Sequence, residues 1–328
     1  MADFKVVVTD YVLPNFDIER EMLEAVGAEL VLGQCESAQQ LVDIAVDADA
    51  LINTYYGPLS DEVFAGCKKA KVCVRLGIGY DTFDLEAATR HGVMMANVPD
   101  YCLEEVSDHA IGLWLGVARR IPLMNSTVRT GDWTVNRMRP VANTRGQTVG
   151  IIGVGRIGSL VARKLSGFGV QLIYCDPYVE EASLKGVDCR KVELEELCRE
   201  SDAIFVHALA NEETHHLLNE ARFKQMTKRP FIINTARAAL IDEAALEAAL
   251  EGDQIAGVGL DLVEGEQLPE GHPLLAWENV VLTPHVAWYS EDSMIALHSM
   301  ATQEIIRVLE GGVPRSLLNT EVDTEARR

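Results

Sequence analysis

Short runs of apolar, largely β-branched residues recur along the chain, and most are separated by stretches in which apolar residues return every three or four positions. KVVVTD at 5–10 has the continuous apolar pattern of a strand buried on both faces, and DIEREMLEAVGAE at 17–29 has the spacing of a helix. Further strands of this first series are predicted at 29–33, 48–54, 71–77 and 93–97.

A second series of predicted strands begins near residue 148 and alternates with helical patterns. Its strands are predicted at 148–153, 171–177, 203–208, 231–236, 258–263 and 279–285, and its helices at 156–168, 193–199, 219–226 and 242–251. Such alternation predicts parallel sheets with helices on their faces. The chain therefore contains two α/β units, and periodicity alone leaves open whether they share one sheet.

Between the two series, residues 100–122 form a helical pattern bounded by Pro99 and Pro122. Its second half, AIGLWLGVA, is apolar around most of its circumference, which predicts burial between domains or in a dimer. Residues 123–147 are expected to be irregular. The last helical pattern, at 290–312, is expected to return to the first series, and the polar tail EVDTEARR to be mobile.

Composition narrows the class of protein. A length of 328 residues favours two domains, and a net charge of −21 argues against a nucleic-acid surface or an anionic membrane. The seven cysteines are scattered without a CxxC pair, which indicates free thiols in a reducing compartment. With no signal-peptide pattern and no long uncharged apolar run, a cytoplasmic location is expected.

Residues 148–169, TVGIIGVGRIGSLVARKLSGFG, contain a glycine fingerprint that follows a predicted strand and opens a predicted helix. Gly153 permits the tight turn, Gly155 lets a pyrophosphate approach the main chain, and Gly158 lets the helix pack on the strand. Asp176 lies 18 residues after Gly158, at the end of the next strand. An acid there binds the ribose hydroxyls and repels the extra phosphate of NADP, so NAD is the predicted cofactor.

Reduction of a ketone by hydride requires a proton donor and a cation that holds the substrate carboxylate. His285 and Arg237 each follow a predicted strand, where open α/β sheets bind their ligands. Taken alone, a histidine after a strand is more often structural and an arginine more often a surface cation. Chemistry also leaves Glu264 and Glu266 as alternatives for a carboxylate partner of His285.

Over nearly its whole length the chain resembles the D-isomer-specific 2-hydroxyacid dehydrogenases. The resemblance rests on motifs in a specific order and spacing: RLGIGYDTFDLEAATRHGV (75–93), NVP (97–99), TVGIIGVGRIG (148–158), YCDP (174–177), THHLLN (214–219), NTARAALIDEAAL (234–246), GVGLD (257–261) and LTPH (282–285). It implies an oxidoreductase that moves a hydride between NAD and a small 2-oxo or 2-hydroxy acid.

The resemblance assigns the catalytic roles. It implies that Arg237 binds the substrate carboxylate and carbonyl and that His285 is the acid/base. The family glutamate lies five residues after the aspartate that ends its strand, and Asp261 plus five is Glu266. A carboxylate there stabilises the imidazolium. Gln267 stands where the family has a proline.

The resemblance also implies binding residues. Arg75 and the main chain of Gly77, Ile78 and Gly79 are expected to contact the substrate, the latter as a nest of N–H groups, and Trp288 to line the substrate pocket. The implied cofactor contacts are Val106, Gly153, Gly155, Arg156, Ile157, Gly158, Asp176, Pro177, His207, Thr214, Thr235, Ala236, Arg237, Asp261 and His285. No metal is expected.

The implied architecture is α/β, with two Rossmann-like doubly wound parallel-sheet domains and a cleft between them. Residues 1–99 with 291–328 are expected to form a flavodoxin-like substrate-binding domain, and residues 100–290 the NAD-binding Rossmann domain. Linkers near Val98–Pro99 and Tyr289–Ser290 are expected to act as a hinge that closes the cleft. The buried helix before residue 122 suggests a homodimer formed through the cofactor domain.

Three segments, HALANEETHHLLN (207–219), TPHVAWYSE (283–291) and PRSLLN (314–319), resemble the branch that contains the C-terminal-binding protein corepressors and their bacterial dehydrogenase relatives. In that branch Trp288 favours a substrate with an apolar side chain. Alternatives are a glyoxylate or hydroxypyruvate reductase, a phosphoglycerate dehydrogenase, or an NAD(H)-sensing binding protein with little catalysis. Glu266 argues against a formate dehydrogenase, because those relatives carry an amide at this position.

Overall fold

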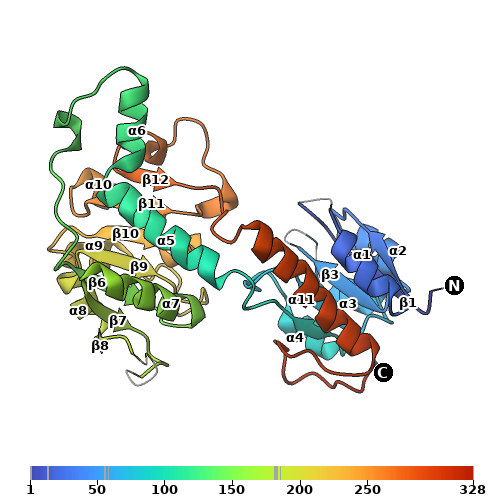
Figure 1. Ribbon diagram of the computed structural model, residues 1–328. Helices are drawn as coiled ribbons and strands as arrows, with labels where there is room; N and C mark the ends of the chain where they lie inside the picture. Colours follow the sequence, from blue (N-terminus) through green and yellow to red (C-terminus); the bar gives the residue numbers. More distant parts are fainter. Residues whose placement is uncertain are drawn as a thin grey trace. The chain divides into compact units, whose positions relative to one another are not determined.

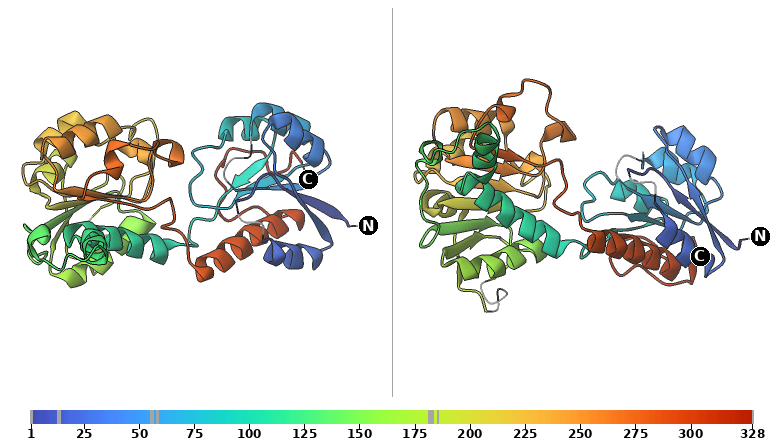
Figure 2. Two further views of the ribbon diagram at one scale, coloured as in Figure 1. Left: turned by 90° about the horizontal axis from the view of Figure 1, so that it is seen from above. Right: turned by 45° about the horizontal axis from the view of Figure 1, so that its top comes forward.

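The computed structural model describes residues 2–12, 15–54, 57, 59–180, 184 and 186–327, and it divides into two compact units. Unit 1 comprises Met1–Cys102 and Ser290–Arg328, and unit 2 comprises Leu103–Tyr289. Each unit is a parallel sheet with helices on both faces (Figures 1 and 2). The predicted fold class, two Rossmann-like parallel-sheet α/β domains, is confirmed.

Unit 1 contains a five-stranded sheet in the order β2-β1-β3-β4-β5, in which every pair is parallel. Its strands are β1 (Phe4–Val8), β2 (Ala28–Leu32), β3 (Ala50–Asn53), β4 (Val72–Arg75) and β5 (Met94–Ala96). Its helices are α1 (Asp17–Glu24), α2 (Ala38–Ala45), α3 (Asp61–Gly66), α4 (Leu85–Arg90) and α11 (Glu291–Leu309).

Successive apolar residues of a buried strand point to opposite faces of this sheet, so both faces are apolar. Val6 and Val8 pack with α1 and α11, whereas Val7 between them packs with α2, α3 and α4. Helix α11 begins with a capping box, in which the Ser290 and Ser293 side chains each accept a hydrogen bond from the backbone N–H of the other. The C-terminal end of the chain is therefore built into the same core as its first strands.

Unit 2 contains a seven-stranded parallel sheet in the order β12-β11-β10-β9-β6-β7-β8. Its strands are β6 (Thr148–Ile152), β7 (Gln171–Cys175), β8 (Cys189–Lys191), β9 (Ala203–Val206), β10 (Phe231–Asn234), β11 (Gly257–Leu260) and β12 (Val280–Leu282). Its helices are α5 (Leu103–Ala118), α6 (Ile121–Arg129), α7 (Arg156–Leu165), α8 (Leu194–Glu200), α9 (Glu220–Gln225) and α10 (Glu243–Glu251), with short 3-10 turns η1 (Asn136–Met138), η2 (Ser166–Phe168), η4 (Ala238–Leu240), η5 (Glu264–Glu266) and η6 (Pro273–Leu275).

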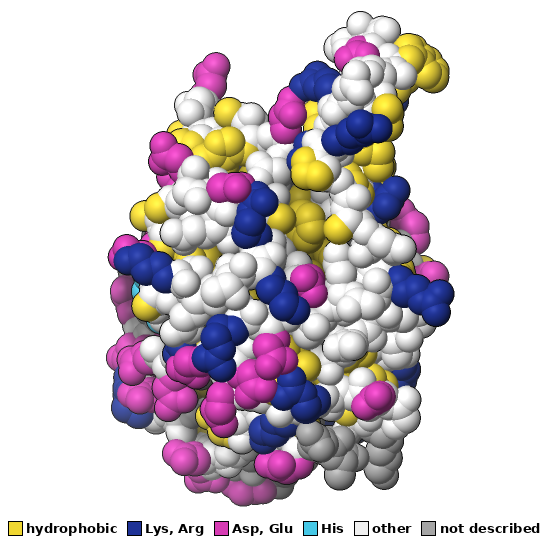
Figure 3. Space-filling view, turned by 90° about the vertical axis from the view of Figure 1, so that its left-hand side faces the viewer, with side chains coloured by type: hydrophobic (Ala, Val, Ile, Leu, Met, Phe, Trp, Pro, Cys, Tyr) yellow, Lys and Arg dark blue, Asp and Glu magenta, His cyan; other side chains and the backbone are white. Residues whose placement is uncertain are grey.

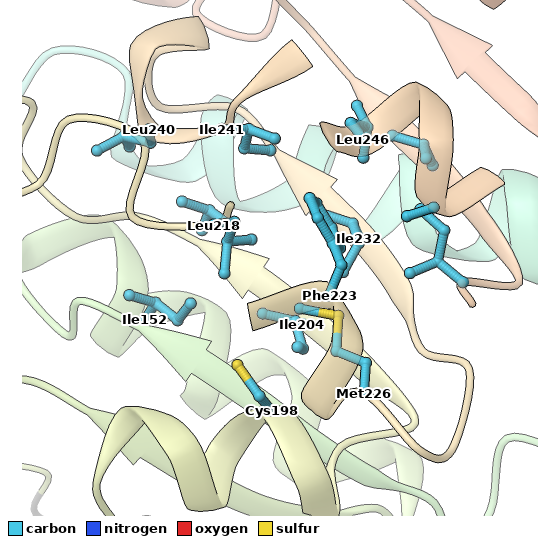
Figure 4. Close-up of a cluster of buried hydrophobic side chains, with 14 of the residues drawn as sticks. Ile152, Cys198, Ile204, Leu218, Phe223, Met226, Ile232, Leu240, Ile241 and Leu246 are labelled. Atoms are coloured by element: carbon cyan, nitrogen blue, oxygen red, sulfur yellow. The ribbon is translucent and has the colours of Figure 1, made fainter. Parts of the chain in front are cut away.

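Two clusters of buried side chains hold this sheet. On one face Ile204 and Ile232 pack with residues from α8, α9 and α10, such as Cys198 and Leu246 (Figure 4). On the other face α5 and α7 cover the sheet, and the fully buried Trp114 of α5 lies edge-on to Phe205. Alternate residues of one strand thus belong to different clusters, as expected for a sheet covered on both sides.

Several local predictions are wrong. The helix expected at 100–122 ends at Ala118, and Arg120, with φ 51°, turns the chain into α6, whose first turn holds Pro122. Residues 123–147 are therefore not irregular throughout. The apolar circumference of α5 is buried inside unit 2, between the sheet and α7, which removes the reason given for a dimer through this helix.

The C-terminal tail also differs from the expectation of a mobile segment. Val322 is buried, and the Arg327 guanidinium donates hydrogen bonds to the carbonyls of Phe64, Cys67 and Ala70. Within the described part of the chain, every helix is too short or too polar to span a bilayer.

Candidate active site

The glycine fingerprint lies where the strand order of unit 2 reverses. Strand β6 pairs with β7 on one side and with β9 on the other, and ligands of open α/β sheets bind at such a switch point. Gly153 has φ +85°, and a Cβ there would come within 2.7 Å of the Ala208 nitrogen after β9. A Cβ at Gly158 would collide with the Gly153 carbonyl oxygen, so both positions require glycine.

Gly155 differs from these two glycines, because a Cβ built on it meets no atom within 4 Å. Packing therefore gives no reason for glycine at this position, whereas a pyrophosphate lying against the backbone would. The Asp176 carboxylate accepts N–H bonds from Val154 and Tyr178, at 2.9 Å each, which holds it beside the glycine loop. An ionised carboxylate has capacity for further donors, such as ribose hydroxyls.

Two enclosed polar atoms lie at the same edge of the sheet. Among the described residues, His207 Nε2 after β9 and Thr235 Oγ1 after β10 are buried without a hydrogen-bond partner. Buried polar atoms normally have partners, and a bound dinucleotide would supply them. Burial lowers the pKa of His207 to about 4, so this imidazole is neutral at physiological pH. These features fit NAD.

The other predicted cofactor residues are spread over several elements of unit 2. Arg156 and Ile157 form the first turn of α7, Pro177 follows β7, Thr214 lies in the loop after β9, Ala236 follows β10, and Val106 is buried on α5. The Thr214 hydroxyl donates to the Leu209 carbonyl at 2.6 Å, which closes the loop on which it lies.

His285 and Glu266 lie side by side. Nδ1 of His285 is 2.9 Å from Oε2 of Glu266, and both residues have left-handed backbone angles, with φ of 52° and 63°. Such angles are costly for residues other than glycine and are concentrated at functional sites. Glu264, the alternative partner, is exposed in the same short turn, next to Gly265.

A buried carboxylate holds the turn that carries His285. Asp261 accepts hydrogen bonds from the Thr283 hydroxyl at 2.5 Å and from the N–H groups of Val286 and Ala287 at 3.0 and 2.8 Å. Nε2 of His109, on α5, lies 2.8 Å from the Thr283 hydroxyl oxygen. The described bonds of Asp261, which is also predicted to contact the cofactor, anchor this turn. No sequence motif pointed to His109.

Arg237 stands directly after the β10 turn and before η4. The buried Asn234 shapes this turn, since its Oδ1 accepts the Ala236 N–H and its Nδ2 donates to the Arg237 carbonyl. Arg237 Nη1 donates to the Ala236 carbonyl at 2.7 Å. Near His285, Trp288 donates its indole N–H to the His285 carbonyl at 2.7 Å, so its ring position is tied to the histidine turn.

In unit 1, the predicted substrate loop follows β4. Arg75 is buried, and its Nε donates to the Gly79 carbonyl at 3.2 Å. The Ile78 carbonyl accepts from the Asn97 side chain at 2.6 Å, and the Gly77 carbonyl accepts from the Val98 N–H at 3.0 Å. The loop is therefore fixed through its carbonyl groups.

Comparison with known proteins places this site in a family. The sequence matches the family described as D-isomer specific 2-hydroxyacid dehydrogenase, NAD binding domain, over residues 111–287. A glyoxylate reductase from Korarchaeum cryptofilum is 35% identical over 289 residues, which cover 87% of each chain. A D-3-phosphoglycerate dehydrogenase from Methanocaldococcus jannaschii is 33% identical over 316 residues, 96% of this chain and 59% of that protein. The apo structure of D-lactate dehydrogenase from Escherichia coli has a TM-score of 0.82 and 30% identity, over 96% of this chain and 99% of that one.

The chain therefore belongs to the D-isomer-specific 2-hydroxyacid dehydrogenase family. It is an NAD-dependent oxidoreductase of 2-hydroxy acids, which confirms the predicted family, reaction class and cofactor. The three relatives are named for different acids, so membership of the family leaves the substrate side chain open.

Proposed function

We propose that His285, Glu266 and Arg237 are the catalytic groups of this dehydrogenase. The observation that carries the proposal is the 2.9 Å contact between His285 Nδ1 and Glu266 Oε2. Bound NADH supplies the hydride that reduces C2 of a 2-oxo acid. The imidazolium of His285, stabilised by the Glu266 carboxylate, gives the proton from Nε2 to the forming alkoxide, and the neutral imidazole takes it back in the oxidation direction. Arg237 holds the substrate carboxylate and polarises the carbonyl.

The substrate carboxylate is proposed to bind the loop after β4. Among the described residues, the N–H groups of Ile78, Gly79 and Tyr80 have no hydrogen-bond partner. Successive N–H groups of this kind can bind an anion. A substrate-binding domain of residues 1–99 and 291–328 and a cofactor domain of residues 100–290 are part of this proposal, with linkers near Val98–Pro99 and Tyr289–Ser290. The change from one compact unit to the other at Cys102–Leu103 and at Tyr289–Ser290 supports these boundaries.

Steady-state kinetics with NADH and a panel of 2-oxo acids tests the proposal. We expect His285→Ala to lower kcat by at least about 100-fold, as for loss of a general acid. Arg237→Ala should raise KM and lower kcat, because it removes both the carboxylate contact and the cation that polarises the carbonyl. His91→Ala, at a histidine of unit 1, should leave both constants unchanged. Glu266→Gln removes the charge that stabilises the imidazolium, so kcat for reduction of the 2-oxo acid should fall. An unchanged kcat would remove Glu266 from its role, and no turnover with any acid would favour an NAD(H)-sensing binding protein.

We propose that the substrate has an apolar side chain. We also propose that the chain belongs to the branch that contains the C-terminal-binding protein corepressors. Trp288 supports the apolar substrate, because its indole is tied by a hydrogen bond to the turn of His285. Glyoxylate, hydroxypyruvate and phosphoglycerate remain the alternative substrates, and the same panel distinguishes them by kcat/KM.

The protein is further proposed to be a cytoplasmic homodimer that associates through the cofactor domain. Its seven cysteines are free thiols, which suits a reducing compartment. Support for the dimer comes from the segment around α6, where large apolar side chains are exposed: Ile121, Val128, Trp133 and Val135. Figure 1 shows α6 apart from the sheet of unit 2, and Figure 3 shows hydrophobic side chains on the part that projects at the top. Exposed apolar patches of this kind mark association surfaces.

A further inference from the structure

Three consecutive peptide groups of the loop after β4 are each anchored through their carbonyl oxygen. The Val98 N–H binds the Gly77 carbonyl, the Asn97 amide binds the Ile78 carbonyl, and Arg75 Nε binds the Gly79 carbonyl. A trans peptide is planar, so its N–H points away from its carbonyl. Each anchor therefore aims the N–H of the next residue: Ile78, Gly79 and Tyr80 respectively.

The third anchor depends on a cation that is taken out of water. Arg75 is 5% exposed, and a buried guanidinium is stable only where its donors are paired. Its Nη1 donates to Oδ1 of Asn53 at 3.0 Å. Asn53, at the end of β3, is buried as well, and its Nδ2 donates to Oδ1 of Asp10 at 3.1 Å. One amide thus joins a buried carboxylate to a buried guanidinium.

Asp10 in turn is fixed from several sides. Its Oδ1 accepts from the Thr9 hydroxyl at 2.7 Å and the Thr54 N–H at 3.0 Å, and its Oδ2 accepts from the Thr54 hydroxyl at 2.6 Å. With Asp10 held in this way, the Asn53 amide has one favourable orientation: nitrogen toward the carboxylate and oxygen toward Arg75. The guanidinium of Arg75 connects this amide to the loop, because its Nη1 binds Asn53 and its Nε binds the Gly79 carbonyl.

We propose that Asp10 and Asn53 are positioning residues that set the anion-binding loop through Arg75. The relay runs from the ends of β1 and β3 across β4 into residues 77–80 and holds the third N–H of the loop toward the substrate carboxylate. It rests on the proposed binding of the substrate carboxylate at this loop. The effect of the relay belongs to substrate binding, because the proton-transfer groups His285 and Glu266 lie in unit 2.

The test replaces Asn53 and measures KM for a 2-oxo acid and the dissociation constant of NADH. Asn53→Ala removes the amide that accepts from Arg75 Nη1, so we expect KM for the best 2-oxo acid of the panel to rise about tenfold, with kcat changed less than about threefold. The dissociation constant of NADH, measured by quenching of tryptophan fluorescence, should stay the same. Asn53→Ser keeps a small group that can donate and accept, so it should recover part of the KM, and it serves as the second variant if Asn53→Ala folds poorly.

Asn319→Ala is the matched control, since Asn319 is another buried amide of unit 1, bonded to Met95 N–H and the Val93 carbonyl. It should lower the unfolding midpoint as much as Asn53→Ala does and leave KM unchanged. Equal KM for Asn53→Ala and the wild type, or an equal rise in KM in the Asn319 control, would overturn the relay alone. A wild type that turns over no 2-oxo acid would instead overturn the proposed function, and with it the carboxylate that the relay is proposed to position.

Discussion

Burial of the His207 imidazole makes the free energy of unfolding depend on pH. Its folded pKa of about 4 lies below the ordinary value near 6.5, so between these pH values the unfolded chain binds a proton that the folded chain does not. Stability is therefore lost as pH falls from 6.5 toward 4. Between pH 7 and pH 5 this group should cost about 2 kcal/mol of unfolding free energy.

Urea unfolding at the two pH values measures this cost. His207→Gln removes the titrating group, so its loss of stability between pH 7 and pH 5 should be about 2 kcal/mol smaller than that of the wild type. His215→Gln, at an exposed histidine of the same loop, should behave like the wild type. If all three proteins lose the same free energy, the neutral buried state assigned to His207 is wrong.

Residues of the candidate site differ in how far the sequence could predict them. Glu266 was selected over Glu264 by its spacing from Asp261, and the structure places it against His285. The bonds of Asp261 to the histidine turn and of Asn53 to Arg75 join segments that are distant in the chain. Such bonds depend on strand register and loop path, which no local pattern encodes.

Among the elements, long apolar strands were predictable because burial on both faces leaves a continuous apolar run, as in β6 and β9. Strand β8, CRK, is short and polar, and it forms because it pairs with β7 at the edge of the sheet. Helix α6 was missed because Pro122 was taken as a stop, although proline suits the first turn of a new helix.

The exposed apolar residues around α6 are expected to form the contact between the two copies of the proposed dimer. Trp133 is 82% exposed, and replacing it with glutamate places a charge in the proposed contact between copies. Sedimentation equilibrium should show a dimer for the wild type and a monomer for Trp133→Glu. Val46→Glu, at an exposed apolar residue on unit 1, is the matched control and should remain a dimer. A dimer that persists in Trp133→Glu would place the interface elsewhere.

At the scale of the whole molecule, each unit has its own sheet and its own buried clusters, so each is expected to unfold as a separate cooperative transition. The chain offers a selective probe, because all four tryptophans (Trp114, Trp133, Trp277 and Trp288) lie in unit 2. Tryptophan fluorescence therefore follows unit 2 alone, whereas far-ultraviolet circular dichroism follows both units.

NAD⁺ should separate the two transitions, since the fingerprint that binds it lies in unit 2. At about 100 times its dissociation constant the cofactor adds about 2.7 kcal/mol to the stability of the unit that binds it. The fluorescence midpoint should rise accordingly, while part of the dichroism signal unfolds at the original midpoint.

A variant that destabilises unit 1 alone provides the second experiment. His298→Leu leaves the fully buried Glu19 of unit 1 without its imidazole partner. It should lower the unfolding midpoint of unit 1, which circular dichroism detects and tryptophan fluorescence does not. Midpoints that move together in both experiments would mean that the two units unfold as one, and that the free energy of cofactor binding to unit 2 also stabilises unit 1.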